Sequence, residues 1–156
     1  MLKQLQKRKD QTGFTIIEVL IVLAIAGLII LIVLLAVPAL QRNSRNTSIK
    51  SEASAMAGAI SSFSSNADGA RINTISANGL ITGVGTAVTE QAKLQGATTV
   101  ATITATPGAV VTHGTLSVWL GHNCNNVASS RSTAIWYSIE TTSAETAASN
   151  NKCVEA

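Results

Sequence analysis

Aromatic and charged residues are scarce in this chain of 156 residues. Only 3% of the residues are aromatic and 12% are Asp, Glu, Lys or Arg, which is about half the usual charged share. Close to half of the Leu, Ile and Val lies between residues 14 and 40, and the rest of the chain is rich in Ala, Ser, Thr, Asn and Gly. The C-terminal part must therefore build a small core from few large side chains. We expect that core to be marginal unless a disulfide or a packed helix stabilises it.

Residues that could form a catalytic or metal site are also few. His113 and His122 lie in a Gly- and Asn-rich stretch without a clear acidic partner. No nucleophile–base pair, phosphate-cradling glycine loop or pair of carboxylates is recognisable. The two cysteines, even with His122 in an H-x-C pattern, do not have the spacing of a zinc site. We therefore predict that the protein is not an enzyme and has no metal site and no cofactor.

The net charge of +3 belongs to one short segment. The first 13 residues contain four basic side chains and one acidic one, whereas from Phe14 onward seven basic residues balance seven acidic ones. A chain without its first 13 residues would be neutral. The charge pattern therefore argues against a nucleic-acid partner, which would need a basic patch.

Residues 19–40 form an uncharged apolar run of 22 residues. As a helix the run would span roughly 33 Å at ~1.5 Å per residue, against a hydrocarbon core of ~30 Å. Pro38 lies inside the run, where it removes a backbone donor, and we expect it to soften the helix. The basic first segment weakly favours an N-terminus in the cytoplasm. On hydropathy alone a plain signal anchor explains the run as well as any other interpretation.

Glu18 argues against a plain signal anchor. A carboxylate at the edge of an apolar segment is energetically costly, and a segment that only anchors the chain has no use for it. No basic side chain lies within a helical turn of Glu18. A cut between Gly13 and Phe14 would create a cation four residues away, the new α-amino group of Phe14. That amine could pair with Glu18 of its own chain or of an adjacent subunit.

The string from Gly13 to Glu18, GFTIIE, follows a short basic leader and precedes about twenty apolar residues. It resembles the class III signal sequence of type IV prepilins and pseudopilins. The resemblance implies that prepilin peptidase cuts after Gly13 and methylates Phe14, and that Glu18 meets the N-terminal amine of a neighbouring subunit during assembly. Pro38 is similar to the helix-softening proline of pilins, although it lies a few residues later than in many members. Thr12 stands where a basic residue often precedes the glycine.

This resemblance leads us to expect a major pilin, a structural subunit of a type IV pilus. Its partners would be further copies of itself in a helical filament, prepilin peptidase and the inner-membrane assembly machinery. It would span the bacterial cytoplasmic membrane once before assembly and lie in an extracellular pilus afterwards. One alternative is a pseudopilin of a type II secretion or DNA-uptake system. Another is a monomeric, membrane-anchored binding module.

The region after Pro38 should continue the helix. Six apolar residues recur at spacings of four and three, which predicts one apolar face on an amphipathic helix: Ile49, Ala53, Met56, Ile60, Phe63 and Ala67. Residues 66–69, Asn-Ala-Asp-Gly, should end it. We therefore divide the chain into a leader (1–13), a transmembrane or filament-core helix (14–40), an amphipathic continuation (41–68) and a C-terminal part (69–156).

The C-terminal part should be a loop over 69–96 followed by a small antiparallel sheet. Alternating residues predict strands, with Ala101 and Ile103 on one face of the first and Leu116 and Val118 on one face of the next. Ile135, Tyr137 and Ile139 alternate in the same way, and Pro107-Gly108 has the chemistry of a type II turn. The predicted fold class is α+β and pilin-like: a long N-terminal helix, half transmembrane and half amphipathic, packed on this sheet.

Cys124 and Cys153 are the only cysteines, and in an exported domain one disulfide is the default expectation. Such a bridge resembles the disulfide-bounded C-terminal region of many major pilins. It would stabilise the fold by ~3–4 kcal/mol in the chain-entropy model. Asn46-Thr47-Ser48 also matches an N-glycosylation acceptor pattern, close to the apolar run.

Overall fold

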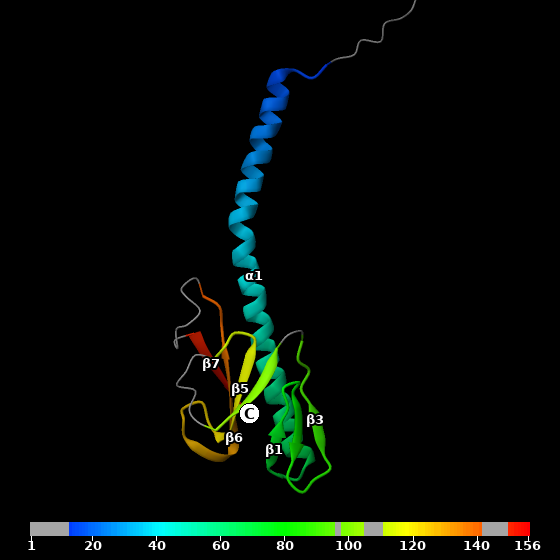
Figure 1. Cartoon of the computed structure of the whole chain (residues 1–156), viewed down its shortest axis with the longest axis vertical. Helices are drawn as coiled ribbons and strands as arrows, with labels where there is room; N and C mark the ends of the chain where they lie inside the picture. Colours follow the sequence, from blue (N-terminus) through cyan, green and yellow to red (C-terminus); the bar gives the residue numbers. More distant parts are fainter. Residues whose placement is uncertain (1–12, 96–97, 105–110, 142–149) are drawn as a thin grey trace, which may run out of the picture. The chain divides into compact units, whose positions relative to one another are not determined.

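The computed structural model describes residues 13–95, 98–104, 111–141 and 150–156 (Figure 1). The chain divides into two compact units, Met1–Leu40 and Gln41–Ala156, and we refer to the second as the C-terminal unit. One helix, α1 (Ile16–Asn66), contributes residues to both units. All strands among the described residues belong to the C-terminal unit, and the fold class is α+β, as predicted.

The core of the C-terminal unit is built on the predicted apolar face of α1. All six residues of that face are buried, at 7% exposure or less. They form one cluster with apolar residues from both sheets, including Ile75 and Ile81 of the first and Leu116 and Ile135 of the second. Figure 1 shows the last part of α1 beside both sheets. The helix face therefore fills the gap that the shortage of large residues would otherwise leave.

The predicted end of α1 over residues 66–69 is also present. The Gly69 N–H donates to the carbonyl of Ser64 at 3.1 Å, and the residue before it, Asp68, has a left-handed φ of 49°. This is the Schellman arrangement, which satisfies carbonyls that the last turn of a helix leaves unpaired. The chain then turns into the first strand.

The strands form two sheets. The first has the order β1-β2-β3, with β1 (Ile72–Ile75), β2 (Leu80–Gly83) and β3 (Thr89–Gln91) pairing antiparallel. The second has the order β4-β5-β6-β7, built from β4 (Thr99–Ile103), β5 (Thr115–His122), β6 (Ala128–Ser138) and β7 (Asn151–Glu155). The Val100 N–H donates to the Ala77 carbonyl at 2.9 Å, which links the two sheets.

Two details of the expected sheet were wrong. Residues 69–96 contain the three-stranded sheet, not mainly a loop, and Asn78-Gly79 between apolar residues was the hairpin signal that could have predicted it. The second sheet is mixed, because β4 pairs with β5 in parallel. The turn expected at Pro107-Gly108 lies outside the described residues.

The second sheet buries the inward residues predicted on β5 and β6, but Ser117, Trp119 and Ser138, which were expected on the other face, are buried as well. On a third strand the predicted inward face was wrong. Leu116 and Val118 are fully buried, and so is Ile135. On β4, however, Val100 is buried and Ala101 is exposed, so the strand has the opposite face inward from the one expected. The parallel partner explains the shift, since Val100 pairs with the inward-facing Leu116. The alternation of Ala and Thr alone carried too little hydrophobic contrast to fix the face.

Gly83 in β2 has a packing role. A Cβ built on Gly83 would lie 2.5 Å from the ring of Phe63 and 2.6 Å from a methyl group of Thr86. Such a distance is far inside van der Waals contact, so only glycine lets β2 approach α1 this closely. The first sheet and the helix therefore meet at a point where a backbone contacts a ring.

Gly58 offers a test of helix stability. It is an exposed residue inside α1, and a Cβ built there meets nothing within 4 Å. Alanine costs less backbone entropy than glycine in a helix interior, so Gly58→Ala should stabilise the C-terminal unit by about 1 kcal/mol. Urea unfolding of the full chain in detergent measures this. A Gly83→Ala control should be destabilised, and an unchanged or lowered stability of Gly58→Ala would contradict the explanation.

Candidate functional site

The predicted processing site lies just before the first turn of α1. Gly13, Phe14 and Thr15 precede the helix, which begins at Ile16. The Phe14 side chain is 87% exposed, and a Cβ built on Gly13 meets nothing within 4 Å. The peptide bond between Gly13 and Phe14 is therefore not covered by the described residues of the chain.

Glu18 closes a capping box with Thr15. The Thr15 backbone N–H donates to Glu18 Oε2 at 2.9 Å, and the Thr15 hydroxyl donates to the same oxygen at 2.8 Å. In return the Glu18 N–H donates to Thr15 Oγ1 at 3.3 Å. These bonds satisfy backbone donors that the start of a helix leaves without partners.

Sequence reasoning assigned Glu18 a role in pairing with an amine and missed its role as a cap. The signal was present, since Thr15-x-x-Glu18 directly before an apolar run is the capping-box pattern. Only Oε2 takes part in the box. Within the described part of the chain Oε1 accepts no hydrogen bond, so the carboxylate keeps one oxygen for another partner.

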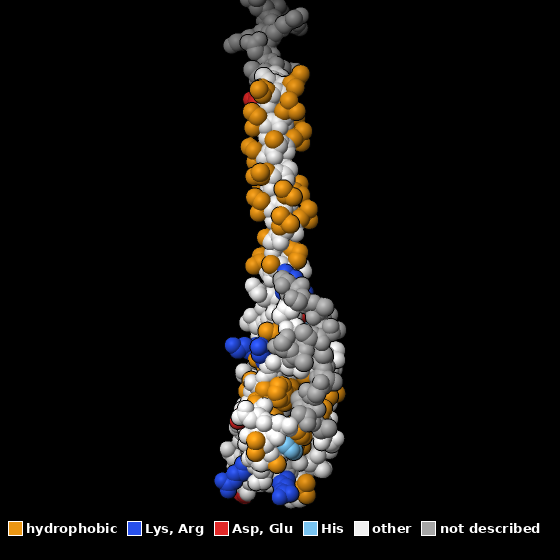
Figure 2. Space-filling view, turned by 90° about the vertical axis from the view of Figure 1, so that its left-hand side faces the viewer, with side chains coloured by type: hydrophobic (Ala, Val, Ile, Leu, Met, Phe, Trp, Pro, Cys, Tyr) orange, Lys and Arg blue, Asp and Glu red, His pale blue; other side chains and the backbone are white. Residues whose placement is uncertain are grey.

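The apolar run of α1 is uncovered on every side. All Ile, Leu and Val residues from Ile16 to Leu40 are exposed, from 38% at Val37 to 82% at Ile16. Figure 2 shows these side chains, in orange, along the helix. An 18-residue stretch of α1 has a mean hydropathy of 3.5, and the helix is long and apolar enough to cross a membrane. An apolar surface of this kind is consistent with membrane anchoring.

Pro38 lies within α1, and the helix is assigned without a break from Ile16 to Asn66. Proline has no N–H to donate to the preceding turn, so one hydrogen bond of the ladder is missing there. Softening of the helix at Pro38 stays a prediction.

Just beyond the apolar run, polar side chains of α1 bind Glu140, which lies two residues after the end of β6. Arg45 donates from Nε to Glu140 Oε1 at 2.6 Å and from Nη2 to Glu140 Oε2 at 2.5 Å. The ring nitrogen Nε2 of His113 lies 2.9 Å from the same Oε1. We call Arg45, Asn46, His113 and Glu140 the junction cluster.

Asn46 binds the backbone of Glu140 with both ends of its amide. Its Nδ2 donates to the Glu140 carbonyl at 2.9 Å, and its Oδ1 accepts from the Glu140 N–H at 2.7 Å. Because a glycan would be attached to that same Nδ2, the acceptor pattern at Asn46 is occupied by a structural contact. Glycosylation at Asn46 would require the junction cluster to open.

The Arg45 guanidinium lowers the pKa of Glu140 below its ordinary value of 4.5, and the nearby charges of His113 and Arg42 act in the same direction. Burial acts in the opposite direction and raises the pKa of Glu140, since its side chain is only 8% exposed. The hydrogen bonds to the charged form dominate. The carboxylate is therefore held ionised at the junction.

Cys124 and Cys153 form a disulfide, with a sequence separation of 29 and Cα atoms 5.8 Å apart. The bridge joins the loop between β5 and β6 to β7. The Cys124 N–H also donates to Glu155 Oε1 at 2.7 Å, on the same strand. Among the described residues, no group of three or more His, Cys, Asp or Glu could hold a metal ion.

The lowered pKa of Glu140 predicts how stability depends on pH. A group whose folded pKa is depressed contributes stability that is complete above its unfolded value, and the contribution disappears as the pH falls through the lower folded value. Glu140→Gln should therefore reduce the free energy of unfolding by about 1–2 kcal/mol at pH 7, since Arg45 is half exposed. Below pH 4.5 the wild-type and variant values should converge. Urea unfolding of the full chain in detergent, from pH 7 to pH 3, measures both, and a gap that stays constant with pH would contradict the assignment.

Comparison with known protein families finds a match for one segment at the start of the chain. The model of the prokaryotic N-terminal methylation motif matches residues 8–34, which include the predicted cut, Glu18 and the start of the apolar run. No curated protein and no solved structure matches the chain. The motif implies processing by a prepilin peptidase and assembly into filaments, and its family consists of structural proteins and not enzymes. Together with the long apolar helix that follows, the motif is consistent with the class III signal sequence of type IV pilins.

Proposed function

We propose that the chain is a major pilin, the structural subunit of a type IV pilus. Prepilin peptidase cuts between Gly13 and Phe14 and methylates Phe14, and the subunits then polymerise through α1. The observation that carries this proposal is the uncovered apolar surface of residues 16–40, which begins at a capped carboxylate. An uncovered apolar surface of this length is not useful to a soluble monomer.

The apolar surface of residues 16–40 must be shielded from water both before and after assembly. A buried Leu or Ile side chain is stabilised by about 1.5–3 kcal/mol relative to one in water, and the run contains many such residues. Lipid covers them before assembly, and neighbouring copies of α1 cover them in the filament. Because lipid is as apolar as the side chains, packing and polar contacts must favour the filament over the membrane.

Glu18 supplies that polar contact. The Oε2 atom of Glu18 stays in the capping box with Thr15. Its Oε1 atom accepts a hydrogen bond from the α-ammonium group of Phe14 of a neighbouring subunit. Methylation leaves the amine positive, so the pairing survives the modification. In an apolar surrounding an unpaired carboxylate is costly, and the pairing therefore selects the register in which subunits add.

The remaining features support export of the C-terminal unit. The basic side chains of residues 1–13 favour a cytoplasmic N-terminus, and a disulfide between Cys124 and Cys153 suits an oxidising compartment. A bridged C-terminal region favours a major pilin over a pseudopilin of a type II secretion or DNA-uptake system. We expect the mature unit to be exposed along the fibre.

Electron microscopy of sheared surface material, with mass spectrometry of its N-terminus, tests the proposal. We expect long fibres whose subunit begins with methylated Phe14 and lacks residues 1–13. A Gly13→Val control should stay uncut and form no fibres, although its C-terminal unit should fold, since a Cβ at Gly13 meets nothing. Methylated Phe14 without surface fibres would favour the pseudopilin. An intact Met1 found only in membrane fractions would overturn both alternatives.

Substitutions of Glu18 distinguish the ion pair from the cap. Glu18→Gln keeps an oxygen that can accept from Thr15 but removes the charge, whereas Glu18→Ala removes both. Loss of a charge-assisted hydrogen bond costs about 1.5–3 kcal/mol, so both variants should lower the amount of fibre at least about tenfold while export and folding persist. Thr15→Ala weakens only the cap, by about 1 kcal/mol, and should assemble better than either. Fibres at the wild-type level with Glu18→Gln would contradict the ion pair.

A further inference from the structure

The turn between β1 and β2 contains the only Asn-Gly pair in the sequence, Asn78-Gly79. Such a pair is chemically labile, because glycine has no side chain to hinder attack of its backbone nitrogen on the asparagine side chain. The attack closes a succinimide ring and releases ammonia, and water then opens the ring to give aspartate or isoaspartate. The turn therefore carries a group that can change without any enzyme.

In the folded unit the attacking nitrogen already has a hydrogen-bond partner. The Gly79 N–H donates to the Ser76 carbonyl at 2.8 Å, and the Ser76 N–H donates to the Leu80 carbonyl at 2.9 Å. Gly79 is buried and has a φ of 83°. A Cβ built on it would lie 3.0 Å from the Leu94 side chain, so the backbone at Gly79 has little room to turn toward Asn78. The nitrogen can lose its proton to solvent only when the turn opens.

The Asn78 side chain and carbonyl are held as well. The Ser76 hydroxyl donates to Asn78 Oδ1 at 2.5 Å, and the Leu80 N–H donates to the same oxygen at 3.4 Å. From β3, Gln91 Nε2 donates to the Asn78 carbonyl at 2.7 Å. Asn78 itself is exposed, so access of water to its side chain does not limit the reaction. The bonds of the turn and the burial of Gly79 limit it instead.

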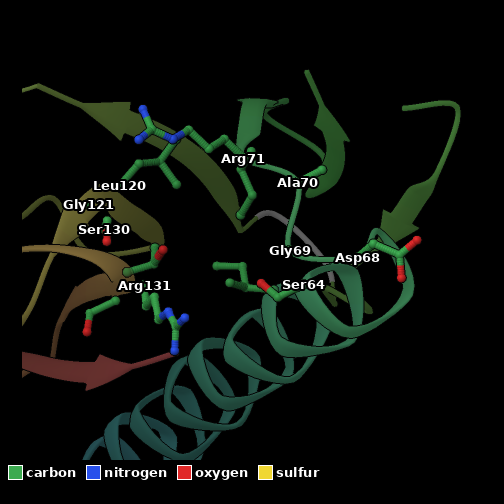
Figure 3. A pocket seen from close by; sticks show the side chains of 13 residues that line it. Ser64, Asp68, Gly69, Ala70, Arg71, Leu120, Gly121, Ser130 and Arg131 are labelled. Atoms are coloured by element: carbon green, nitrogen blue, oxygen red, sulfur yellow. The ribbon is translucent and has the colours of Figure 1, made fainter. Parts of the chain in front are cut away.

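The open hollow of the C-terminal unit provides no other route to Gly79. The hollow lies among the end of α1, the start of β1 and the strands β5 and β6, and Figure 3 shows Gly69, Arg71 and Gly121 around it. Neither Asn78 nor Gly79 lines it. Hydroxide from solvent therefore reaches the Gly79 nitrogen when the hydrogen bonds of the turn break.

We propose that Asn78 is a modification site that folding protects and that opening of the first sheet makes reactive. The deprotonated Gly79 nitrogen attacks Asn78 Cγ, the bond from Cγ to the side-chain nitrogen breaks, and ammonia leaves with a proton from solvent. Water then cleaves one of the two bonds that hold the Gly79 nitrogen in the ring. Cleavage at Cγ gives aspartate. Cleavage at the Asn78 carbonyl carbon gives isoaspartate, whose main chain runs through the former side chain.

The isoaspartate product makes the opening irreversible. Its main chain has an extra carbon before the Gly79 nitrogen, so the turn cannot form again with its present hydrogen bonds to Ser76. The preceding residue, Ala77, accepts from the Val100 N–H at 2.9 Å, which is the bond that links the two sheets. A chain with isoaspartate therefore loses both the turn and this link. The aspartate product keeps the original main chain and an oxygen for the Ser76 hydroxyl. None of these steps depends on the cut at Gly13.

Peptide mapping by mass spectrometry, on the full chain in a non-ionic detergent, tests the protection. Samples are kept at mildly alkaline pH with and without concentrated urea. In the folded chain the reaction rate is set by the fraction of molecules in which the turn is open, so Asn78 should react at least about tenfold more slowly without urea. Equal rates in the two samples would overturn the proposal.

Variants of the turn test the contacts that protect it. Ser76→Ala removes the donor to Asn78 Oδ1, and Gln91→Met removes the donor to the Asn78 carbonyl. Each should make the reaction of the folded chain roughly two- to tenfold faster, as expected for one neutral hydrogen bond, and leave the rate in urea unchanged.

Thr74→Ala is the matched control, because it removes an exposed hydroxyl of the same sheet whose partner is Thr82. It should change the folded rate by less than about twofold. Equal acceleration by Thr74→Ala, or no acceleration by either turn variant, would show that the turn contacts do not protect Asn78.

Refolding after the reaction tests the irreversible step. Chains that have reacted in urea are returned to native buffer and treated with a protease, which cleaves molecules that stay open. Among the resistant chains we expect isoaspartate at position 78 to be depleted at least about tenfold. Asn78→Asp controls for the added charge and should refold and resist the protease like the wild type. Isoaspartate at its starting share in the resistant chains would contradict the irreversible step.

Discussion

Phe63 and the backbone at Gly83 meet where α1 packs on the first sheet, and much of the C-terminal unit depends on that contact. The chain has two phenylalanines, and Phe14 is exposed, so Phe63 is the only one in this core. Its ring occupies the space that a side chain on β2 would need. With few other large residues available, the helix face and both sheets must approach one another closely to exclude water.

The junction cluster provides specificity of another kind. Arg45 and Asn46 lie on α1 shortly after the apolar run ends, and together they bind both the carboxylate and the backbone of Glu140. With His113, which also contacts the carboxylate, three side chains bind this single residue just after β6. Because ion pairs alone contribute little at a half-exposed site, the two bonds of the Asn46 amide matter as much as the charge does.

The sequence predicted features that depend on local spacing and missed those that depend on distant partners. The buried face of α1 followed from apolar residues three and four apart, and the helix end followed from Asp68-Gly69. The partners Arg45 and Glu140 are separated by 95 positions, and no local pattern indicates such a pair. The parallel pairing of β4 with β5 was missed for the same reason, since it depends on how the connecting chain returns. The capping box of Thr15 and Glu18 was visible in the sequence and was overlooked.

The candidate site was predicted unevenly. The segment from Gly13 to Glu18 is a short contiguous pattern, which the methylation motif at residues 8–34 includes. The junction cluster could not be predicted, because its residues come from α1, from the segment before β5 and from the segment after β6, and they share no motif. Sites assembled across a fold become visible only once the strands have been ordered.

If the chain is a fibre subunit, as we propose, its disulfide has a mechanical consequence when the fibre carries load. The bridge between Cys124 and Cys153 encloses β6 and the start of β7 within a covalent loop of 29 steps along the chain. At ~3.5 Å per residue, that segment would otherwise contribute about 100 Å of contour length when the chain is pulled open. With the bridge intact, tension passes from one sulfur atom to the other and bypasses the loop. A stretched subunit would therefore be shorter and would return more readily to its folded register.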